Sequence, residues 1–201
     1  MPYSGAILRV LDTRRILLIA ALKVLDEEGE SHFSTRSVCA IAKVTAPTLY
    51  HHFGSADGLL SAALAEAFAQ FLESKRAAVQ SADKVAALRA GWDDYVRFAA
   101  ARPRLYAAMM SSVLKGGQIP AAEQAFALLI ERVTALHAEG RLARTVNEAA
   151  DILWASANAA SLLHVTARLR KVTPPTSAVL DDIRDRAMQA ILISESRGKT
   201  Q

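Results

Sequence analysis

Apolar residues recur along most of the chain at the three- and four-residue intervals that place them on one face of a helix. Near the N-terminus, between the possible caps Asp12 or Thr13 and the stop signal Gly29, they form one stripe: Leu17, Leu18, Ala21, Leu22 and Leu25. The pattern predicts a first helix that starts after Asp12 or Thr13 and ends at Gly29. The residues up to about Leu8 are expected to be frayed.

Two short helices, separated by a tight turn, are predicted next. Ser34 is placed to cap the first of them. Its inward residues would be Val38, Ile41 and Ala42. Thr45 can cap the second, which runs from Ala46 to about His52. Pro47 falls in its first turn, where a missing amide does least harm.

A long fourth helix is predicted from its cap Ser55 to about Lys75. Glycine and proline stop signals then separate five further helices: Ser81 to Ala101, Pro103 to Gly116-Gly117, Pro120 to Gly140, Asn147 to about Arg170, and Ser177 to about Ser194. The expected fold is therefore all-α. A three-helix head at residues 1–54 precedes a larger helical body at residues 55–201.

Composition agrees with helices, because 52% of the residues are hydrophobic and only 9 are glycine and 6 proline. The single cysteine, Cys39, cannot form an internal disulfide, so a reducing cytoplasm is the expected compartment. An apolar run at residues 16–22 follows Arg14-Arg15, but it is far shorter than a bilayer span and acidic residues follow it closely. Neither a targeting signal nor a membrane partner is predicted.

The net charge of +4 is only a weak sign of a polyanionic partner. Residues 1–55 contain six Lys or Arg against five Asp or Glu, so the head is not strongly basic. Most of these acids lie at positions 26–30, apart from Arg36 and Lys43. Any argument for nucleic-acid binding therefore depends on the geometry of the short helices.

Two short helices braced by a third form a helix-turn-helix, whose second short helix can enter the major groove of double-stranded DNA. Leu49 and Phe53 would anchor this recognition helix inward. The outward positions would then be Thr45, Ala46, Pro47, Thr48, Tyr50, His51 and His52. No metal site is predicted at the two histidines, since adjacent helix residues point about 100° apart and no cysteine or carboxylate stands at a suitable spacing.

The run Thr48-Leu49-Tyr50-His51-His52-Phe53 resembles the recognition-helix signature of the TetR family. Ser34-Thr35-Arg36 and the helix from Arg14 to Gly29 stand where the family has them, so the resemblance covers about the first quarter of the chain. It implies that the following residues face bases or sugars: Thr35, Arg36, Thr45, Ala46, Thr48 and His51. It also implies that Tyr50 and His52 hold phosphates.

The chain departs from the family pattern at two positions. Lys43 occupies the turn position where the family usually has glycine, so either the left-handed conformation is adopted at a cost or the turn differs. Ala56, followed by Asp57, stands where a lysine commonly begins the fourth helix, so one phosphate contact is expected to be missing. DNA affinity would then depend more on Lys43, Arg36 and an N-terminal arm that includes Arg9 and Arg14.

Several side chains of the body could together line an apolar cavity for a small molecule: Trp92, Tyr95, Phe98, Tyr106, Met109, Met110, Phe126, Trp154, Asn158 and His164. Asn158 and His164 would supply the polar groups of this cavity, although each residue could equally belong to an ordinary helix core. More loosely, residues 92–98, 103–106 and 153–154 resemble a C-terminal ligand-binding class of the TetR family marked by Trp, His and Gly. Here the His and Gly positions of that class are Asn158 and Ala159.

The last two helices carry faces that suit a homodimer interface. The first face is rich in small residues, and the second is an apolar stripe: Leu153, Ala157, Ala160, Ser161 and His164, then Val179, Ile183, Ala187, Ala190 and Ile191. Two copies would form a four-helix bundle, although both faces could instead complete the core of one chain. A dimer would suit a palindromic operator, because one short recognition helix reads only a few base pairs.

Together these patterns predict a ligand-responsive transcriptional regulator that needs no cofactor. Its most direct form is a repressor that a small apolar effector releases from a palindromic operator, and activation instead of repression stays open. A ligand-independent architectural DNA-binding protein is the alternative. An enzyme that uses the helical cavity is a third possibility, although no nucleophile-base pair, phosphate loop or metal spacing is visible in the sequence.

Overall fold

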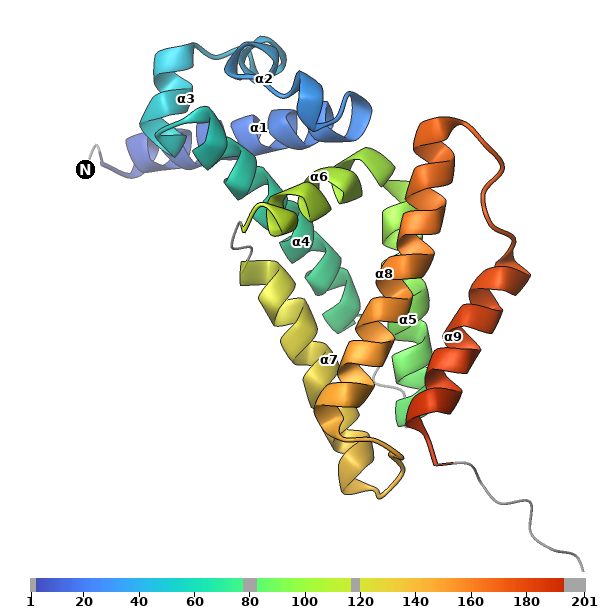
Figure 1. Ribbon diagram of the computed structural model, residues 1–201. Helices are drawn as coiled ribbons and strands as arrows, with labels where there is room; N and C mark the ends of the chain where they lie inside the picture. The colour runs from blue at the N-terminus through green and yellow to red at the C-terminus, as the bar shows by residue number, and fades with distance from the viewer. Residues whose placement is uncertain (1–2, 78–82, 117–119, 194–201) are drawn as a thin grey trace, which may run out of the picture. The chain divides into compact units, whose positions relative to one another are not determined.

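Helices make up the regular structure of the protein. The computed structural model describes residues 3–77, 83–116 and 120–193 (Figure 1). Within these ranges the elements are α1 (Tyr3–Glu27), the 3-10 turn η1 (Glu30–His32), α2 (Thr35–Ala42), α3 (Ala46–Phe53), α4 (Ala56–Ala77), α5 (Lys84–Ala101), α6 (Pro103–Leu114), α7 (Pro120–Ala138), α8 (Val146–Arg170) and α9 (Ser177–Ile191). One isolated bridge joins Leu142 to Leu192. The all-α fold predicted from the sequence is confirmed.

The chain divides into two compact units. Unit 1 combines residues 1–74 with residues 102–122, and unit 2 combines residues 75–101 with residues 123–201. The predicted head at residues 1–54 lies within unit 1. Helix α6 therefore belongs to the same unit as the three N-terminal helices, although it follows them by some fifty residues in the sequence.

Within unit 1, α1 is the helix against which α2, α3 and α6 pack. Its predicted stripe is buried as expected: Leu17, Leu18, Ala21, Leu22 and Leu25. Val38 of α2 and Leu49 of α3 are fully buried and complete this core. Ile41 was expected to face inward and is instead exposed, because Val38 is the buried position of the short helix α2.

The start of α1 differs from the prediction. The helix begins at Tyr3, so Asp12 and Thr13 lie inside it and do not cap it, and the stretch up to Leu8 that was expected to be frayed is helical. Residues 3–11 contain no proline, and all but Gly5 tolerate a helix, so nothing in their sequence stops it from extending. A capping residue inside a run of helix formers is therefore a weak boundary signal.

Other helix ends agree more closely with the sequence. Ser34 caps α2 through a reciprocal capping box with Ser37, and the Ser55 hydroxyl accepts a hydrogen bond from the backbone N–H of Gly58 at the start of α4. At the start of α8, Thr145 and Glu148 form a second capping box. The helix therefore begins at Val146, one residue before the predicted start at Asn147. Helix α9 ends at Ile191; the predicted limits Ser81 and Ser194 lie outside the described residues.

The core of unit 2 forms where α5, α8 and α9 pack together. Its buried members come from helices on both sides of the α7–α8 connection and include Leu88, Val133, Leu136, Leu153, Met188 and Ile191. The end of α9 is fixed to that connection by two backbone hydrogen bonds, from Ala143 N–H to Ile191 O at 2.8 Å and from Ile193 N–H to Arg141 O at 3.0 Å.

Charged side chains join α9 to α5. Arg184 is the centre of this group and donates to Asp93 at 2.7 Å, and it also lies near Asp181 and Asp185. The hydrogen bond to Asp93 raises the pKa of Arg184, which stays charged. Burial raises the pKa of Asp185, but hydrogen bonds from Arg184 and Arg89 outweigh it and hold this pKa below its usual value. The inner face of α9 is thus secured by charge as well as by apolar packing.

No helix among the described residues is both long and apolar enough to cross a membrane.

Candidate nucleic-acid interface

The turn between α2 and α3 adopts the strained alternative that the sequence left open. Lys43 follows the last residue of α2 with φ 55° and ψ 41°, the left-handed conformation that favours glycine. Its backbone N–H donates to Cys39 O, and the N–H of Val44 reaches the same carbonyl at 3.3 Å. The glycine-like turn therefore forms, and Lys43 is exposed at its tip.

Helix α3 is anchored to unit 1 at its middle and at its end. Leu49 is fully buried, and Phe53 in the last turn is half-buried. The guanidinium carbon of Arg14, on α1, lies 5.1 Å from the centre of the Phe53 ring. Arg14, expected in a DNA-binding arm, thus packs on the end of the recognition helix, while the side chain of Arg9 is outside the described residues.

The residues predicted to face DNA lie at the surface of unit 1. Five of them are exposed and four are half-buried: Arg36, Lys43, Thr45, Tyr50 and His51 in the first group, and Thr35, Ala46, Thr48 and His52 in the second. Between their anchors, α2 and α3 therefore present the predicted set to solvent, on the elements drawn together at the top of Figure 1.

Hydroxyl groups connect these outward residues. The hydroxyls of Tyr50, on α3, and Thr35, in the first turn of α2, share a hydrogen bond of 3.4 Å. Thr45 stands at the N-cap of α3, but its hydroxyl bonds to that of Thr48 at 2.9 Å instead of capping the helix. These four residues were predicted individually from the sequence, which carries no signal that their hydroxyls pair. The pairing limits the rotamers of the side chains that would meet DNA.

Neighbouring positions supply little further chemistry. The first turn of α4 carries the exposed Asp57 and no basic residue, as the departure at Ala56 predicted. Burial raises the pKa of the Cys39 thiol, which suits a packing role for this side chain. The part of the chain that the structure describes contains no group of three or more His, Cys, Asp or Glu side chains that could hold a metal ion.

The predicted effector residues are divided between the two units. Seven lie in unit 2: Trp92, Tyr95 and Phe98 on α5, Phe126 on α7, and Trp154, Asn158 and His164 on α8. The other three, Tyr106, Met109 and Met110, lie on α6 in unit 1, where Tyr106 and Met109 are buried. The structure therefore groups seven of the ten within one compact unit.

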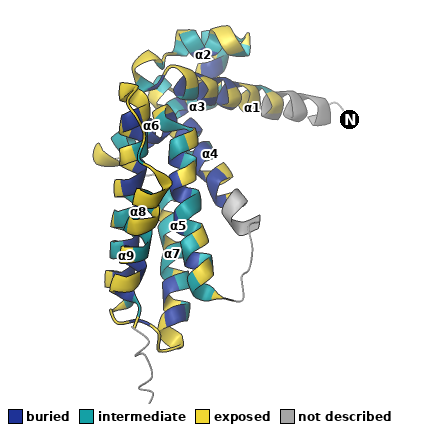
Figure 2. Ribbon diagram, turned by 90° about the vertical axis from the view of Figure 1, so that its right-hand side faces the viewer, coloured by how far each residue is buried: buried dark blue, intermediate teal, exposed yellow. Residues whose placement is uncertain are grey.

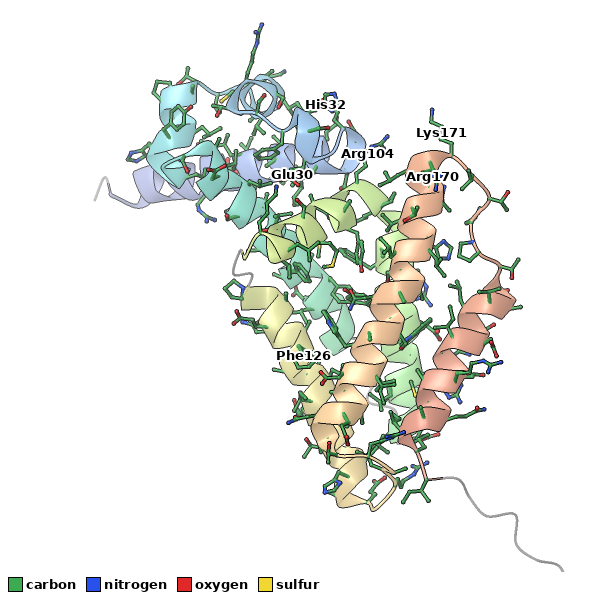
Figure 3. All side chains as sticks on the ribbon, in the orientation of Figure 1. Glu30, His32, Arg104, Phe126, Arg170 and Lys171 are labelled. Carbon is green, nitrogen blue, oxygen red and sulfur yellow. The ribbon has the colours of Figure 1, made fainter. Side chains whose placement is uncertain are left out.

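Three aromatic rings form a cluster in unit 2. The Trp154 ring lies 5.5 Å from that of Tyr95 and 5.7 Å from that of Phe126, centre to centre, so α8 contacts both α5 and α7 through one side chain. Figure 3 marks Phe126 on the α7 side of this contact. Trp154 and Phe126 are only half-buried, whereas Tyr95 is buried.

Polar groups next to the cluster are bonded within the protein. The Tyr95 hydroxyl donates to Asn158 Oδ1 at 2.9 Å, and Asn158 Nδ2 donates to the carbonyl of Trp154 at 2.8 Å. Trp92 Nε1 donates to the Ser156 hydroxyl at 2.9 Å. Ser156 was missed in the sequence because a serine in an Ala-rich helix carries no signal until its partner is known.

Two further polar side chains of α8 differ in their surroundings. Burial, with a smaller contribution from Arg168, lowers the pKa of the half-buried His164, which favours its neutral form. Ser161 was assigned to a dimer face, yet it is fully buried in the single chain and its hydroxyl has no hydrogen-bond partner among the described residues.

Comparison with known proteins agrees with this geometry. Residues 17–63 match the family model described as "Bacterial regulatory proteins, tetR family". A protein of unknown function from Rhodococcus sp. RHA1 has a similar structure, with a TM-score of 0.76 and 23% identity over 90% of this chain and 96% of the other. A TetR family transcription regulator from Marinobacter aquaeolei VT8 gives a TM-score of 0.70 at 17% identity, covering 92% and 97% of the two chains.

A third similar structure contains a ligand. It is the transcriptional regulator FadR from Bacillus subtilis in complex with stearoyl-CoA, with a TM-score of 0.67 and 14% identity over 88% of this chain and 98% of the other. At these identities the solved structures establish the fold. The comparison with curated protein sequences gives no match.

The left-handed lysines allow a direct test of the turn. Lys43 and Lys171, the C-cap of α8, both have φ 55°, and a side chain in that conformation costs about 1 kcal/mol. Lys43→Gly and Lys171→Gly should therefore each raise the free energy of unfolding by about 0.5 kcal/mol, since the gain is partly offset by the freedom of glycine in the unfolded chain. Urea unfolding followed by circular dichroism measures this change. A decrease for Lys43→Gly alone would show that its side chain stabilises the turn more than its backbone strains it.

Proposed function

Residues 17–63 match the model of the TetR family of bacterial regulatory proteins, and on this premise we propose that the chain is a ligand-responsive repressor of that family that binds a palindromic operator as a homodimer. The proposal depends on how α3 packs: Leu49 is buried beneath the helix, and the predicted contact residues remain at the surface. A recognition helix must be held by its own apolar residues while its first turns remain accessible to base edges. Such a regulator would work in the cytoplasm.

The outward residues divide into two roles under this proposal. Thr35, Arg36, Thr45, Ala46, Thr48 and His51 would face bases or sugars, while Tyr50, His52 and Lys43 would hold phosphates. The bond between Tyr50 and Thr35 supports this division, because it places a phosphate-binding hydroxyl next to the first turn of α2. Phosphate contacts position the protein on any duplex, whereas base contacts discriminate among sequences.

This division predicts different effects for two variants. Thr48→Ala should weaken binding to a palindromic operator by about fivefold per half-site, or roughly 25-fold for the dimer, while binding to random duplex changes little. Tyr50→Phe, which removes only the hydroxyl, should weaken binding to both duplexes by a similar factor. Fluorescence anisotropy with labelled duplexes measures both affinities at one fixed salt concentration.

Thr134→Ala is the matched control for these variants. Thr134 is an exposed threonine of α7 whose hydroxyl donates to Ile130 O at 2.8 Å, and its removal should leave both affinities unchanged. If Thr48→Ala binds the operator as the wild type does, or if Thr134→Ala is equally impaired, the proposed recognition surface is wrong.

Dimerisation through α8 and α9 is part of the same proposal. The interface proposed now is a different face from the one rich in small residues that was predicted from the sequence. Leu153, Ala157, Ala160 and Ser161 are buried within the chain's own unit 2, so they are not available to a partner. Figure 2 shows exposed stretches along α8 and α9. Four large apolar residues are exposed on these helices: Leu162, Leu163 and Leu169 of α8 and Val179 of α9.

A second copy of the chain is the partner that this outward face suits. Helices α8 and α9 pack side by side, and two such pairs form a four-helix bundle. Ala155 and Ala159 lie on the outward side of α8 next to the leucines, and small side chains let helices approach closely. A palindromic operator also requires two heads related by a twofold axis.

A charge placed on this face should separate the two copies. Leu162 is 58% exposed, and Leu162→Glu would bury two carboxylates near the twofold axis, so the dissociation constant of the dimer should rise at least about 100-fold. Leu114→Glu is the control, because Leu114 of α6 is 88% exposed and belongs to unit 1. Analytical ultracentrifugation at micromolar concentrations distinguishes the outcomes. A dimeric Leu162→Glu protein would exclude this face.

A small apolar effector is proposed to bind at the aromatic cluster of unit 2. Trp154 bridges Tyr95 and Phe126 while it remains half-buried, and the polar atoms of Asn158 beside it are bonded within the protein. Aromatic rings whose neighbouring polar atoms are already bonded favour contact with an apolar part of a ligand over contact with a charged part. The FadR structure shows a related fold holding stearoyl-CoA, which makes a long acyl chain a suitable first probe. An effector that prefers the DNA-free conformation would lower operator affinity by shifting the population.

Trp154 offers a readout of that binding. In a Trp92→Phe variant it is the one remaining tryptophan, so a ligand at the cluster should change its emission. We expect that among stearoyl-CoA and a panel of small aromatic compounds, those that change Trp154 emission also weaken operator binding, by about tenfold or more at saturation. If operator affinity stays the same for every compound that changes the emission, ligand release is contradicted; if the chain also binds random duplex as tightly as a palindrome, it is a ligand-independent architectural DNA-binding protein.

A further inference from the structure

Helix α6 holds the end of α1 through an ion pair with two-point geometry. Arg102, the residue before α6, directs Nε to Asp26 Oδ1 and Oδ2 at 3.0 and 3.1 Å, and its Nη2 donates to Oδ2 at 2.5 Å. The Arg102 and Asp26 side chains are 26% and 30% exposed. A planar guanidinium that meets a carboxylate along one edge fixes orientation as well as distance.

Two further contacts lie next to this pair in unit 1. At the other end of α6, Lys115 Nζ donates to Glu30 Oε1 at 2.8 Å, and hydrogen bonds from Lys115 and Ser111 hold the pKa of Glu30 below its usual value. Between these two ion pairs, Gly29 is buried with φ 87°, and the aliphatic part of the Arg104 side chain packs against it. Figure 3 labels Glu30 and Arg104 where α6 meets η1.

The corner formed by residues 26–30 leads directly into the DNA-facing helices. Turn η1 occupies Glu30–His32, and the Ser37 hydroxyl of α2 donates to both His32 O and Ser34 O, at 3.2 and 2.9 Å. The first turn of α2 then presents Thr35, which bonds to Tyr50 of α3. A continuous series of contacts therefore runs from Arg102 to the surface that would meet the bases.

We propose that Asp26 and Arg102 are positioning residues for operator recognition: they fix the corner after α1 so that α2 and α3 present their outward side chains in register. The inference rests on the proposed DNA-binding function. A bidentate pair between an arginine and a carboxylate restricts the orientation of the two segments that it joins, so the pair at this corner fixes how the chain leaves α1. Two acids of the run at residues 26–30, Asp26 and Glu30, thus contact the two ends of α6 inside unit 1.

Operator discrimination tests this role. Arg102→Gln keeps the size of the side chain and removes its charge, and Asp26→Arg combined with Arg102→Asp exchanges the partners. The probes are a duplex selected by the wild-type chain from a randomised pool and a random duplex of equal length. Arg102→Gln should weaken binding to the selected duplex by about tenfold, which lies within the range for residues that act through a contact network. Binding to the random duplex should weaken by less than about twofold.

The control and the opposing outcomes separate position from stability. Arg186→Gln removes the exposed pair with Asp182 on α9, at 2.7 Å, and should change neither affinity. The exchanged pair should recover at least half of the lost discrimination on a logarithmic scale. If the exchanged protein does not fold, as judged by circular dichroism, Arg102→Lys replaces it and should give an intermediate affinity. Equal loss on both duplexes, unchanged discrimination in Arg102→Gln, or no recovery in the exchanged or lysine variant would overturn the inference.

The wild-type measurement distinguishes a failure of this inference from a failure of the proposed DNA-binding function on which it rests. A wild-type chain that selects no duplex from the pool contradicts the DNA-binding proposal itself. A wild-type chain that discriminates normally, together with an Arg102→Gln variant that discriminates equally well, contradicts only the role of Asp26 and Arg102.

Discussion

The burial of Leu49 is the constraint on which the N-terminal structure depends. Helix α3 has only eight residues, too few to be stable in water without tertiary contacts, so its conformation is maintained by what lies beneath it. Leu49 provides that contact in the middle of the helix, and the stacking of Arg14 on Phe53 supports its last turn. Because one face is held in this way, the other can carry threonine, tyrosine and histidine side chains at the surface.

Local signals allowed most of this arrangement to be predicted from the sequence. The apolar stripe of α1, the Ser34 cap and the end of α3 close to His52 each depend on residues within one or two turns, and the structure confirms them. Lys43 shows where such signals end. The sequence indicated a conflict between a tight turn and a side chain, but only the backbone angles show that the turn prevails. The start of α1 was wrong because Asp12 and Thr13 are compatible with helix interior as well as with a cap.

Contacts between distant residues could not be predicted in this way. Asp26 and Arg102 are 76 positions apart, and Tyr95 and Asn158 are 63 apart, so neither pair leaves a periodic trace in the sequence. Helix α8 illustrates the same limit for whole faces. Its small residues and its leucines both repeat at helical spacing, and either could have faced a partner. The structure buries Ala157, Ala160 and Ser161 because α5 and α9 pack against that side of α8, which leaves Leu162 and Leu163 outside.

Ion pairs lie inside both units, and in each unit they lie away from the surface that is proposed to bind a partner. In unit 1, Asp26 and Glu30 near the end of α1 are paired with Arg102 and Lys115, so the negative charge of these two side chains is neutralised locally. In unit 2, Arg184 and its aspartates lie between α9 and α5 and join these helices. The outward face of α8 carries exposed leucines instead. Ion pairs thus hold helices together inside each unit, and the two outward surfaces keep the chemistry that the proposed partners would require: hydroxyl and basic groups for a nucleic acid, and apolar groups for a second copy.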